Sequence, residues 1–324
     1  MVDGYFTCDF FIFDSSLLLI VFVNNIKKFF VLFVLYFEMK HVRLGMTESG
    51  LFLLDYVYRY TNVDGNTKQQ VINTIANLVN WLYTTSGYYD KTVPGNNFNF
   101  DNRALNKNYF KFIQSMEEAV QNCDKTMFYF HKGFIMNLFI RFKDDFIKHR
   151  KINNFVLLND VKFADRIQSG FFNYMENKRV LVISSFDGLI KSQYESRNVF
   201  KVYENFPKIT GLETVKFPYC FLNNGPHNNY FETVEAVFEE IKTKNFDLAL
   251  LGCGSYGHLL CHKIHMELNK DAIYVGGCIT NLFGILSSRE KEHSNIKTNK
   301  YWITEIPDEY KPPNYKLIEN GCYW

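Results

Sequence analysis

The residues best suited to chemistry form a glycine-rich bend in the second half of the chain. Residues 247–257 read DLALLGCGSYG, an apolar run that leads into the spacing G-x-G-x-x-G. Glycines at this spacing let the backbone turn tightly, and the amides and dipole of a following helix stabilise an anion. The bend predicts a site for a phosphate-bearing ligand, or else a tight strand-to-helix turn that binds nothing. The residues predicted to contact the ligand are Gly252, Gly254, Ser255, Tyr256 and Gly257.

The strand expected after this bend, residues 272–275, ends without an acidic residue. It runs directly into Gly276 and Gly277. In NAD-binding sheets, a carboxylate at this position accepts hydrogen bonds from the ribose. The sequence therefore argues against an NAD-dependent dehydrogenase. The glycine pair itself follows a strand, as the first bend does, and predicts a second stretch of backbone close to the ligand.

Another set of candidate residues lies at a strand-to-helix turn in the first half, RLGMTE at 43–48. Glu48 would stand one turn into the helix beside Arg43, where it could be a metal ligand, an acceptor for a sugar hydroxyl or a general base. Alternatively, Thr47 and Glu48 only cap and stabilise the start of the helix. On the functional interpretation, Glu48 is catalytic, and Arg43 and Gly45 bind substrate.

Polar residues also follow the strand expected at 179–184. Ser185 and Asp187 stand at its carboxyl end, where ligands of open parallel sheets gather. Ser185 is a candidate binding residue, and Asp187 is a second candidate base. The next helix offers further substrate contacts, and its basic side chains could pair with phosphates unless they form a solvated helix face. These helix residues are Lys191, Gln193 and Arg197.

Histidine and cysteine patterns do not point to a metal centre. His258, His262 and His265 lie at helical spacing, but the glutamate of the H-E-x-x-H motif is missing, so we do not expect zinc there. The seven cysteines are scattered and include no C-x-x-C pair. This usage is typical of free thiols in a reducing compartment, which predicts a cytoplasmic protein.

The elements that must position these residues alternate between strand and helix. Apolar residues at helical spacing predict helices at 48–60, 69–83, 109–122 and 163–175 after a first strand at 40–45. The second half is expected to alternate strands at 179–184, 246–251 and 272–275 with helices at 230–242 and 256–268. This order predicts an α/β fold, a Rossmann-like, mostly parallel sheet with flanking helices, plus a helical N-terminal portion. A long polar loop at 84–103 is expected to be functional or mobile, and the aromatic, basic region between 122 and 163 has no assignment.

Composition sets the class of protein. The chain has 324 residues and 47% hydrophobic content, enough for one large α/β domain. Its net charge of +2 provides no general attraction to nucleic acid. We expect an apolar segment at 1–38 and one catalytic α/β domain at 39–324. That domain divides into a helix-rich half at 39–178, a Rossmann-like half at 179–284 and a C-terminal tail at 285–324, whose last residues extend over the surface.

The apolar segment contains two runs, 17–23 and 29–37, separated by NNIKK. Each run is shorter than the roughly 20 residues that span a bilayer. Three interpretations stay open: buried strands or a helix, membrane association through residues 15–37, and an upstream extension to a domain that begins near residue 39.

A series of short blocks resembles the proteins related to the GT-D-type glycosyltransferases, a family found in bacteria and some large DNA viruses. The blocks are RLGMTE at 43–48, SGYY at 86–89, RVLVISSF at 179–186, IKSQY at 190–194 with Arg197, GCGSYG at 252–257, IYVGG at 273–277, LFG at 282–284 and ENGCYW at 319–324. They follow one another in order and together extend over residues 40–324.

The resemblance implies an enzyme that moves a sugar from a nucleotide-sugar donor, a UDP-, GDP- or TDP-sugar, to an acceptor glycan. It also implies a divalent metal, Mn²⁺ or Mg²⁺, near an Asp-x-Glu motif. Glu48 matches the glutamate of that motif, whereas Met46 stands at the aspartate position. Residues 287–290, SSRE, lack the basic and tryptophan character expected after the Phe-Gly block. Two other functions stay open, a non-catalytic nucleotide-sugar-binding or assembly protein of the same fold and another nucleotide-dependent enzyme.

Overall fold

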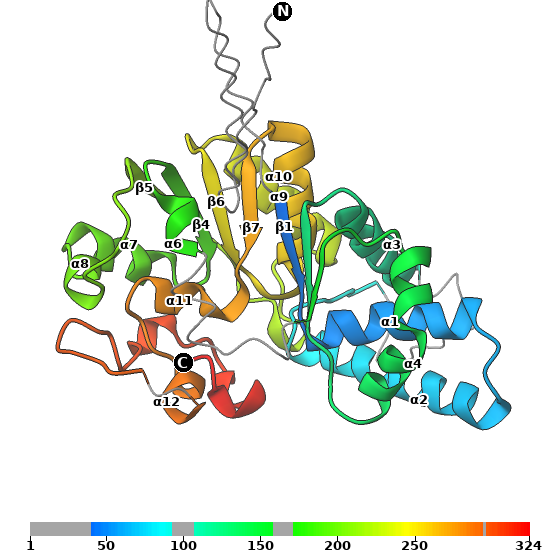
Figure 1. Cartoon of the computed structure of the whole chain (residues 1–324). Helices are drawn as coiled ribbons and strands as arrows, with labels where there is room; N and C mark the ends of the chain where they lie inside the picture. Colours follow the sequence, from blue (N-terminus) through cyan, green and yellow to red (C-terminus); the bar gives the residue numbers. More distant parts are fainter. Residues whose placement is uncertain (1–39, 93–106, 158–170, 294–295) are drawn as a thin grey trace, which may run out of the picture. The chain divides into compact units, whose positions relative to one another are not determined.

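Seven parallel strands form the sheet at the centre of the described part of the chain (Figure 1). Their spatial order is β3-β2-β1-β7-β6-β4-β5, and every neighbouring pair runs parallel. Helices flank the sheet, which confirms the predicted Rossmann-like α/β fold. The strands are β1 (Lys40–Leu44), β2 (Lys125–Phe128), β3 (Phe155–Leu157), β4 (Arg179–Ser184), β5 (Gly211–Lys216), β6 (Leu248–Gly252) and β7 (Asp271–Tyr274).

The computed structural model of the protein describes residues 40–92, 107–157, 171–293 and 296–324. Residues 1–39 lie outside the described residues, and so does the expected membrane association through residues 15–37. Within the described ranges, no helix combines the length and the apolar character that crossing a membrane requires.

Side chains alternate along the strands and divide the interior into two cores. In β4, Leu181 and Ile183 pack into the first core, and Val180 and Val182 pack into the second. Strands that are buried on both faces explain the continuous apolar runs of the sequence. The first core contains residues of α1 (Met46–Tyr60), α2 (Gly65–Thr84), α3 (Lys107–Gln121), α4 (Phe134–His149), α9 (Tyr230–Lys242) and α10 (Gly257–Leu268). The second contains residues of α6 (Phe172–Met175), α7 (Asp187–Glu195), α8 (Val199–Val202) and α11 (Ile279–Leu282).

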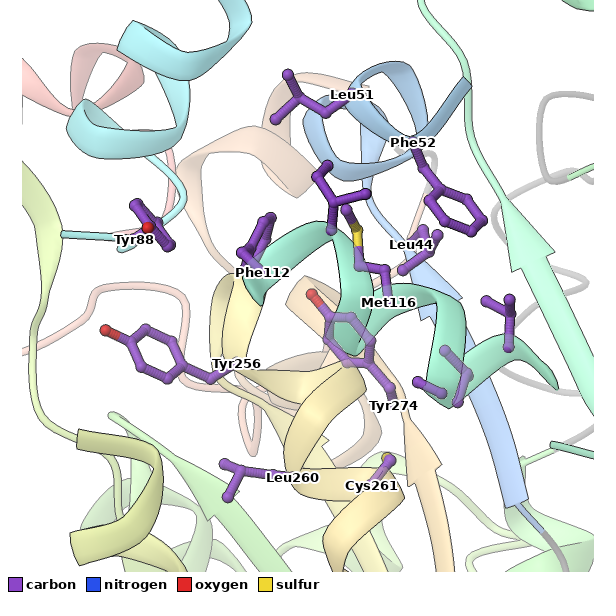
Figure 2. Close-up of a cluster of buried hydrophobic side chains, with 14 of the residues drawn as sticks. Leu44, Leu51, Phe52, Tyr88, Phe112, Met116, Tyr256, Leu260, Cys261 and Tyr274 are labelled. Atoms are coloured by element: carbon purple, nitrogen blue, oxygen red, sulfur yellow. The ribbon is translucent and has the colours of Figure 1, made fainter. Parts of the chain in front are cut away.

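Helix α1 is fixed to the end of β1 by the first core. Leu44 at the end of β1, Phe52 of α1 and Met116 of α3 are fully buried and face one interior, as Figure 2 shows. Helix α10 packs on β1, β7 and α3 in the same region. The first turn of α1, which carries Glu48, is therefore held rigidly at the carboxyl end of β1.

The order of the strands reverses between β1 and β7. From β1 the chain leads outward to β2 and β3, whereas β7 is reached from β6 on the other side. The connections that leave β1 and β7 therefore diverge: β1 continues through Gly45 into α1, and β7 continues into the short 3₁₀ turn η5 (Gly276–Cys278). Ligands of open parallel sheets bind in the crevice at such a point, outside the carboxyl ends of the strands.

Several predicted elements agree closely with the structure. The strand at 179–184 and the helix at 230–242 have the expected bounds, and α1 begins two residues earlier than expected. The unassigned region contains β2, α4 and β3, and the edge strand β5 was not expected at all. Only the end of the helix expected at 163–175 is described, as α6, and the polar loop at 84–103 is described up to residue 92.

The C-terminal tail is not extended over the surface, and that prediction is wrong. Ile306, Ile318 and Trp324 are buried in the second core, and short 3₁₀ turns connect them. In Figure 1 this segment, coloured orange to red, lies at the carboxyl edge of the sheet. Burial of these large apolar side chains outweighs the preference of Pro307, Pro312 and Pro313 for extended backbone.

Candidate functional site

A cleft of about 220 Å³ opens at the carboxyl edge of the sheet, where the strand order reverses. Its walls come from the turns after β1, β6 and β7, from two loops around Ser86 and Pro218, and from the segment 287–324. The cleft brings together residues of both halves of the chain. The residues predicted from the sequence that line it are Arg43, Gly45, Glu48, Ser185, Gly252, Gly254, Tyr256, Gly276 and Gly277.

The glycine-rich bend lies at this edge, but three of its amides are already hydrogen-bonded within the protein. The amide of Ser255 donates to the carbonyl of Ser86 at 3.1 Å, and that of Tyr256 donates to a carbonyl within the bend at 3.3 Å. The amide of Gly257 donates to the carbonyl of Gly254. The expectation that these amides are free to receive an anion is therefore wrong.

The carbonyls of the bend are held as well. The hydroxyl of Tyr274 donates to the Gly254 carbonyl at 2.5 Å, and that of Tyr230 donates to the Ser255 carbonyl at 3.0 Å. Gly254 has φ +56°, a left-handed conformation that favours glycine. Ser255 and Gly257 are buried behind the wall of the cleft. These contacts support the second interpretation of the motif, a tight turn that shapes the cleft.

Glu48 is a buried carboxylate that faces the cleft. It is 4% exposed, and its carboxylate accepts a hydrogen bond from its own backbone amide. Burial raises the pKa of Glu48 above its ordinary value of 4.5; its own backbone amide and Arg43 lower it, and Glu319 raises it further. Gly45 is the N-cap of α1, and no side chain caps the helix there through a hydrogen bond, whereas Glu48 stands in the first turn, where a negative charge stabilises the start of a helix. A carboxylate with a raised pKa is suited to accept a proton.

Arg43 is positioned beside Glu48 from the end of β1. Its Nη1 donates to the carbonyl of Val275 at 3.1 Å, which ties β1 to the end of β7. Its Nε is buried and makes no hydrogen bond to any described residue. The guanidinium thus connects the ends of β1 and β7, between which the strand order reverses. Its remaining N–H donors are used by no described residue.

The candidate residues Lys191 and Gln193 of α7, and Arg197 just beyond its end, are not part of the cleft. Lys191 points to solvent and pairs with Glu195 at 3.8 Å. Gln193 is buried and donates to the carbonyls of Gly284 and Tyr301, and the Arg197 guanidinium stacks on Phe200. Because α7 starts at the carboxyl edge and each residue advances its axis by about 1.5 Å, only its first residues lie near the edge.

Asp187, the second candidate base, is half-buried in the first turn of α7 and is not among the residues that line the cleft. It lies instead near the hydroxyls of Tyr219 and Tyr310. Burial is the main cause of the raised pKa of both tyrosines, and the negative charge of Asp187 raises it further. Ser185, two residues earlier, does line the cleft. Glu48 is therefore the sequence-predicted base that the fold places at the site.

The described residues contain no group of three or more His, Cys, Asp or Glu side chains placed to hold a metal ion. The histidines of α10 serve the interior: His258 Nε2 lies 3.1 Å from Ser115 Oγ, and His262 Nδ1 lies 2.6 Å from Lys40 Nζ. The cleft instead contains two carboxylates, Glu48 and Glu319. One or two carboxylates, completed by phosphate oxygens and water, are the usual protein share of a Mg²⁺ site.

The cysteines within the described ranges are free thiols, as predicted, and Cys8 lies outside those ranges.

Sequence reasoning missed several side chains of the cleft. Tyr129 and His131 follow β2, whose short sequence KTMF carries no clear strand signal, so no local pattern marked them. Burial lowers the pKa of His131, and Glu319 opposes that shift. Arg289 and Glu319 follow no strand, and only the packing of the C-terminal segment places them in the cleft.

Aromatic side chains form much of the remaining wall. Trp81 of α2 is 45% exposed at the cleft, whereas Trp324 is 5% exposed and packs against Phe186 and Tyr219. Flat rings with polar edges suit a ligand that combines ring faces with hydroxyl groups. Comparisons with protein-family models, with curated proteins and with solved structures found no match, so function has to be inferred from this geometry.

Proposed function

We propose that the protein is a glycosyltransferase that moves a sugar from a nucleotide-sugar donor to an acceptor glycan. The observation that carries the proposal is the buried Glu48 carboxylate, which faces Arg43 in an aromatic-walled cleft at the point of strand reversal. A nucleotide-sugar combines a flat base, a diphosphate and a sugar ring. Aromatic faces, guanidinium groups and a carboxylate are the side chains that recognise those three parts.

In the proposed reaction, the bond between the sugar and the diphosphate breaks as an acceptor hydroxyl attacks the sugar carbon. The departing diphosphate takes the bonding electron pair, and Arg43 stabilises its negative charge. The acceptor hydroxyl loses its proton to a base, and Glu48 is suited to this step because burial raises its pKa. His131, which lines the same cleft, is the alternative proton acceptor.

The two carboxylates of the cleft fit a divalent cation shared with the donor. Glu48 and Glu319 would hold Mn²⁺ or Mg²⁺ together with phosphate oxygens and water. Such a cation, when bound, supplies positive charge to the leaving diphosphate. If Glu48 is a ligand of the cation, His131 becomes the base, and the two assignments can be separated by metal binding to Glu48→Gln.

The size of the cleft limits how the donor enters. Pockets that enclose small-molecule ligands usually measure about 300 to 1,000 Å³, and this cleft, at about 220 Å³, is smaller. A cleft of this size would hold only part of a whole nucleotide-sugar.

The proposal is tested by incubating the purified protein with a panel of UDP-, GDP- and TDP-sugars, with and without Mn²⁺, and measuring release of free sugar or nucleoside diphosphate. We expect slow hydrolysis of one donor by the natural protein and by Lys191→Gln, a matched variant outside the cleft. Tight binding without turnover would instead identify a non-catalytic nucleotide-sugar-binding protein. Neither binding nor turnover across the panel would overturn both functions.

A further inference from the structure

We propose that Arg43 and Arg289 form the diphosphate subsite of the cleft, over the glycine pair Gly276 and Gly277. This inference rests on the proposed function and assigns its phosphate contacts to the second glycine turn instead of the first. The ligand class is a diphosphate ester, such as a nucleoside diphosphate. Arg289 is the new residue, because neither its spacing nor the resemblance marked it as a binding residue.

The two arginines lie against consecutive glycines of one turn. A Cβ added at Gly276 would collide with Nη1 of Arg43, and one added at Gly277 would lie 2.5 Å from Nη2 of Arg289. Gly276 also has φ +71°, so the turn needs glycine there for conformation as well as for space. The two guanidinium groups thus lie against neighbouring glycines, whose Cα atoms are about 4 Å apart. Both side chains line the cleft.

Each guanidinium is held in place by part of its donor set. Arg43 donates one hydrogen bond, to the Val275 carbonyl. Arg289 donates through Nε and Nη2 to a single oxygen of Glu290, at 3.3 and 3.2 Å, and its guanidinium stacks 4.9 Å above the ring of Tyr323. A guanidinium has five N–H donors, so in both residues donors remain that no described residue uses. Both guanidinium groups therefore have a fixed orientation and still have unused N–H donors, as expected of a binding site.

The shape and charge of the subsite favour a diphosphate. A planar guanidinium pairs with two oxygens of one phosphate, and two such groups match two linked phosphates better than one. Glu48 and Glu319 lie in the same cleft and repel an anion, and this repulsion grows with the charge of the anion. Binding of a diphosphate should therefore strengthen when Mg²⁺ or Mn²⁺ is added.

The test measures binding by calorimetry to the full chain, with UDP, GDP, TDP and inorganic pyrophosphate as probes, each with and without Mg²⁺. Arg289→Gln removes the charge, Arg289→Lys keeps the charge but not the planar fork, and Arg197→Gln is the matched control outside the cleft. We expect roughly 10- to 100-fold weaker diphosphate binding in Arg289→Gln and Arg43→Gln, and no change in Arg197→Gln. Arg289→Lys should recover only part of the loss.

Gly277→Ala adds a test that removes no charge. Gly277 does not have positive φ, and its added methyl group would meet only the end of a flexible side chain, so the fold is retained. The variant should displace the Arg289 guanidinium and weaken pyrophosphate binding, while its thermal unfolding stays close to that of the natural protein.

The experiments can reject the diphosphate subsite and the glycosyltransferase activity independently of each other. Pyrophosphate binding that falls in both arginine variants, in a protein that turns over no sugar donor, supports the subsite and overturns the glycosyltransferase. Turnover of a sugar donor whose KM is unchanged in Arg289→Gln supports the enzyme and overturns the subsite. Absence of binding by all four probes to the natural protein also overturns the subsite.

Discussion

At the scale of single residues, the most informative side chain is Glu48, because it holds a carboxylate at a position where burial costs stability. The carboxylate is 4% exposed, and burial is the main cause of its raised pKa. Arg43 compensates only in part. Sites with this balance, in which desolvation opposes one charged partner, are typical of catalytic acids and bases.

Because burial disfavours the charged form of Glu48, we predict that Glu48→Gln is more stable than the natural protein, by an amount that depends on pH. The folded protein binds the Glu48 proton more tightly than the unfolded chain does, so the free energy of unfolding falls as the pH rises through the unfolded value near 4.5. Glutamine removes the charge and this penalty. We expect the melting temperature of Glu48→Gln to exceed that of the natural protein at about pH 8, by roughly 2 to 4 °C for each kcal/mol relieved.

The difference in melting temperature should shrink towards about pH 4, where Glu48 is protonated in both states. The comparison uses thermal unfolding followed by circular dichroism at several pH values. An equal or lower melting temperature of Glu48→Gln at about pH 8 would contradict the assigned cause of the pKa shift.

The sequence located Glu48, Arg43 and the glycine turns because each stands at or soon after the end of a buried strand, and the carboxyl ends of parallel strands meet at one edge. It could not locate Arg289 and Glu319. Both belong to a segment whose path depends on tertiary burial of Ile318 and Trp324, and no local pattern records that path. The absence of an aspartate at Met46 says little about acidic groups in the cleft, since Glu319 supplies a second one.

At the scale of elements, α1 is tied to α3 and α4 by a buried arginine. Arg150, at the end of α4, is 2% exposed and pairs with Asp55 of α1 at 2.7 Å and with Glu117 of α3 at 3.1 Å. Its guanidinium also stacks 4.5 Å above the ring of Phe52. These contacts join three helices of the first core and hold the helix that carries Glu48.

We predict that Arg150→Met destabilises the protein by about 3 to 5 kcal/mol, because it leaves the buried Asp55 carboxylate without its most buried partner. Arg141→Met, on the exposed side of the same helix, should change the free energy of unfolding by less than about 0.5 kcal/mol. Urea unfolding of the two variants provides the comparison. Similar unfolding midpoints would show that the pair contributes little.

Element prediction succeeded where a run was long and its period clear, as in β4 and α9. It failed for β2 and β3, which have four and three residues, because runs that short carry too few side chains to show a period of two. Strand β5 lies at the edge of the sheet, and most of its residues are only half-buried, so its sequence GLETVK lacks an apolar signal.

At the scale of the whole molecule, the cleft is assembled from both halves of the α/β domain and from its C-terminal segment. Trp81 comes from α2 and Trp324 from the end of the chain, and both line the cleft. Trp302 is 8% exposed and packs against Tyr203, away from the cleft. The tryptophans can therefore report on whether a ligand enters the cleft.

We predict that a bound nucleoside diphosphate changes the intrinsic fluorescence of the protein, and that Trp81→Phe and Trp324→Phe each lose part of this change because both indoles line the cleft. Trp302→Phe is the control and should keep the full ligand-dependent change. A signal that disappears only in Trp302→Phe would place the ligand elsewhere in the protein.

The most direct test of the proposed sugar transfer at this cleft compares the natural protein with Glu48→Gln, using the donor whose hydrolysis we expect and measuring both turnover and binding of the matching nucleoside diphosphate. We predict that Glu48→Gln lowers kcat by about 100-fold or more while it still binds the nucleoside diphosphate in the absence of metal. Turnover within a few-fold of the natural rate in Glu48→Gln would contradict the assignment of Glu48, and with it the cleft as the site of reaction.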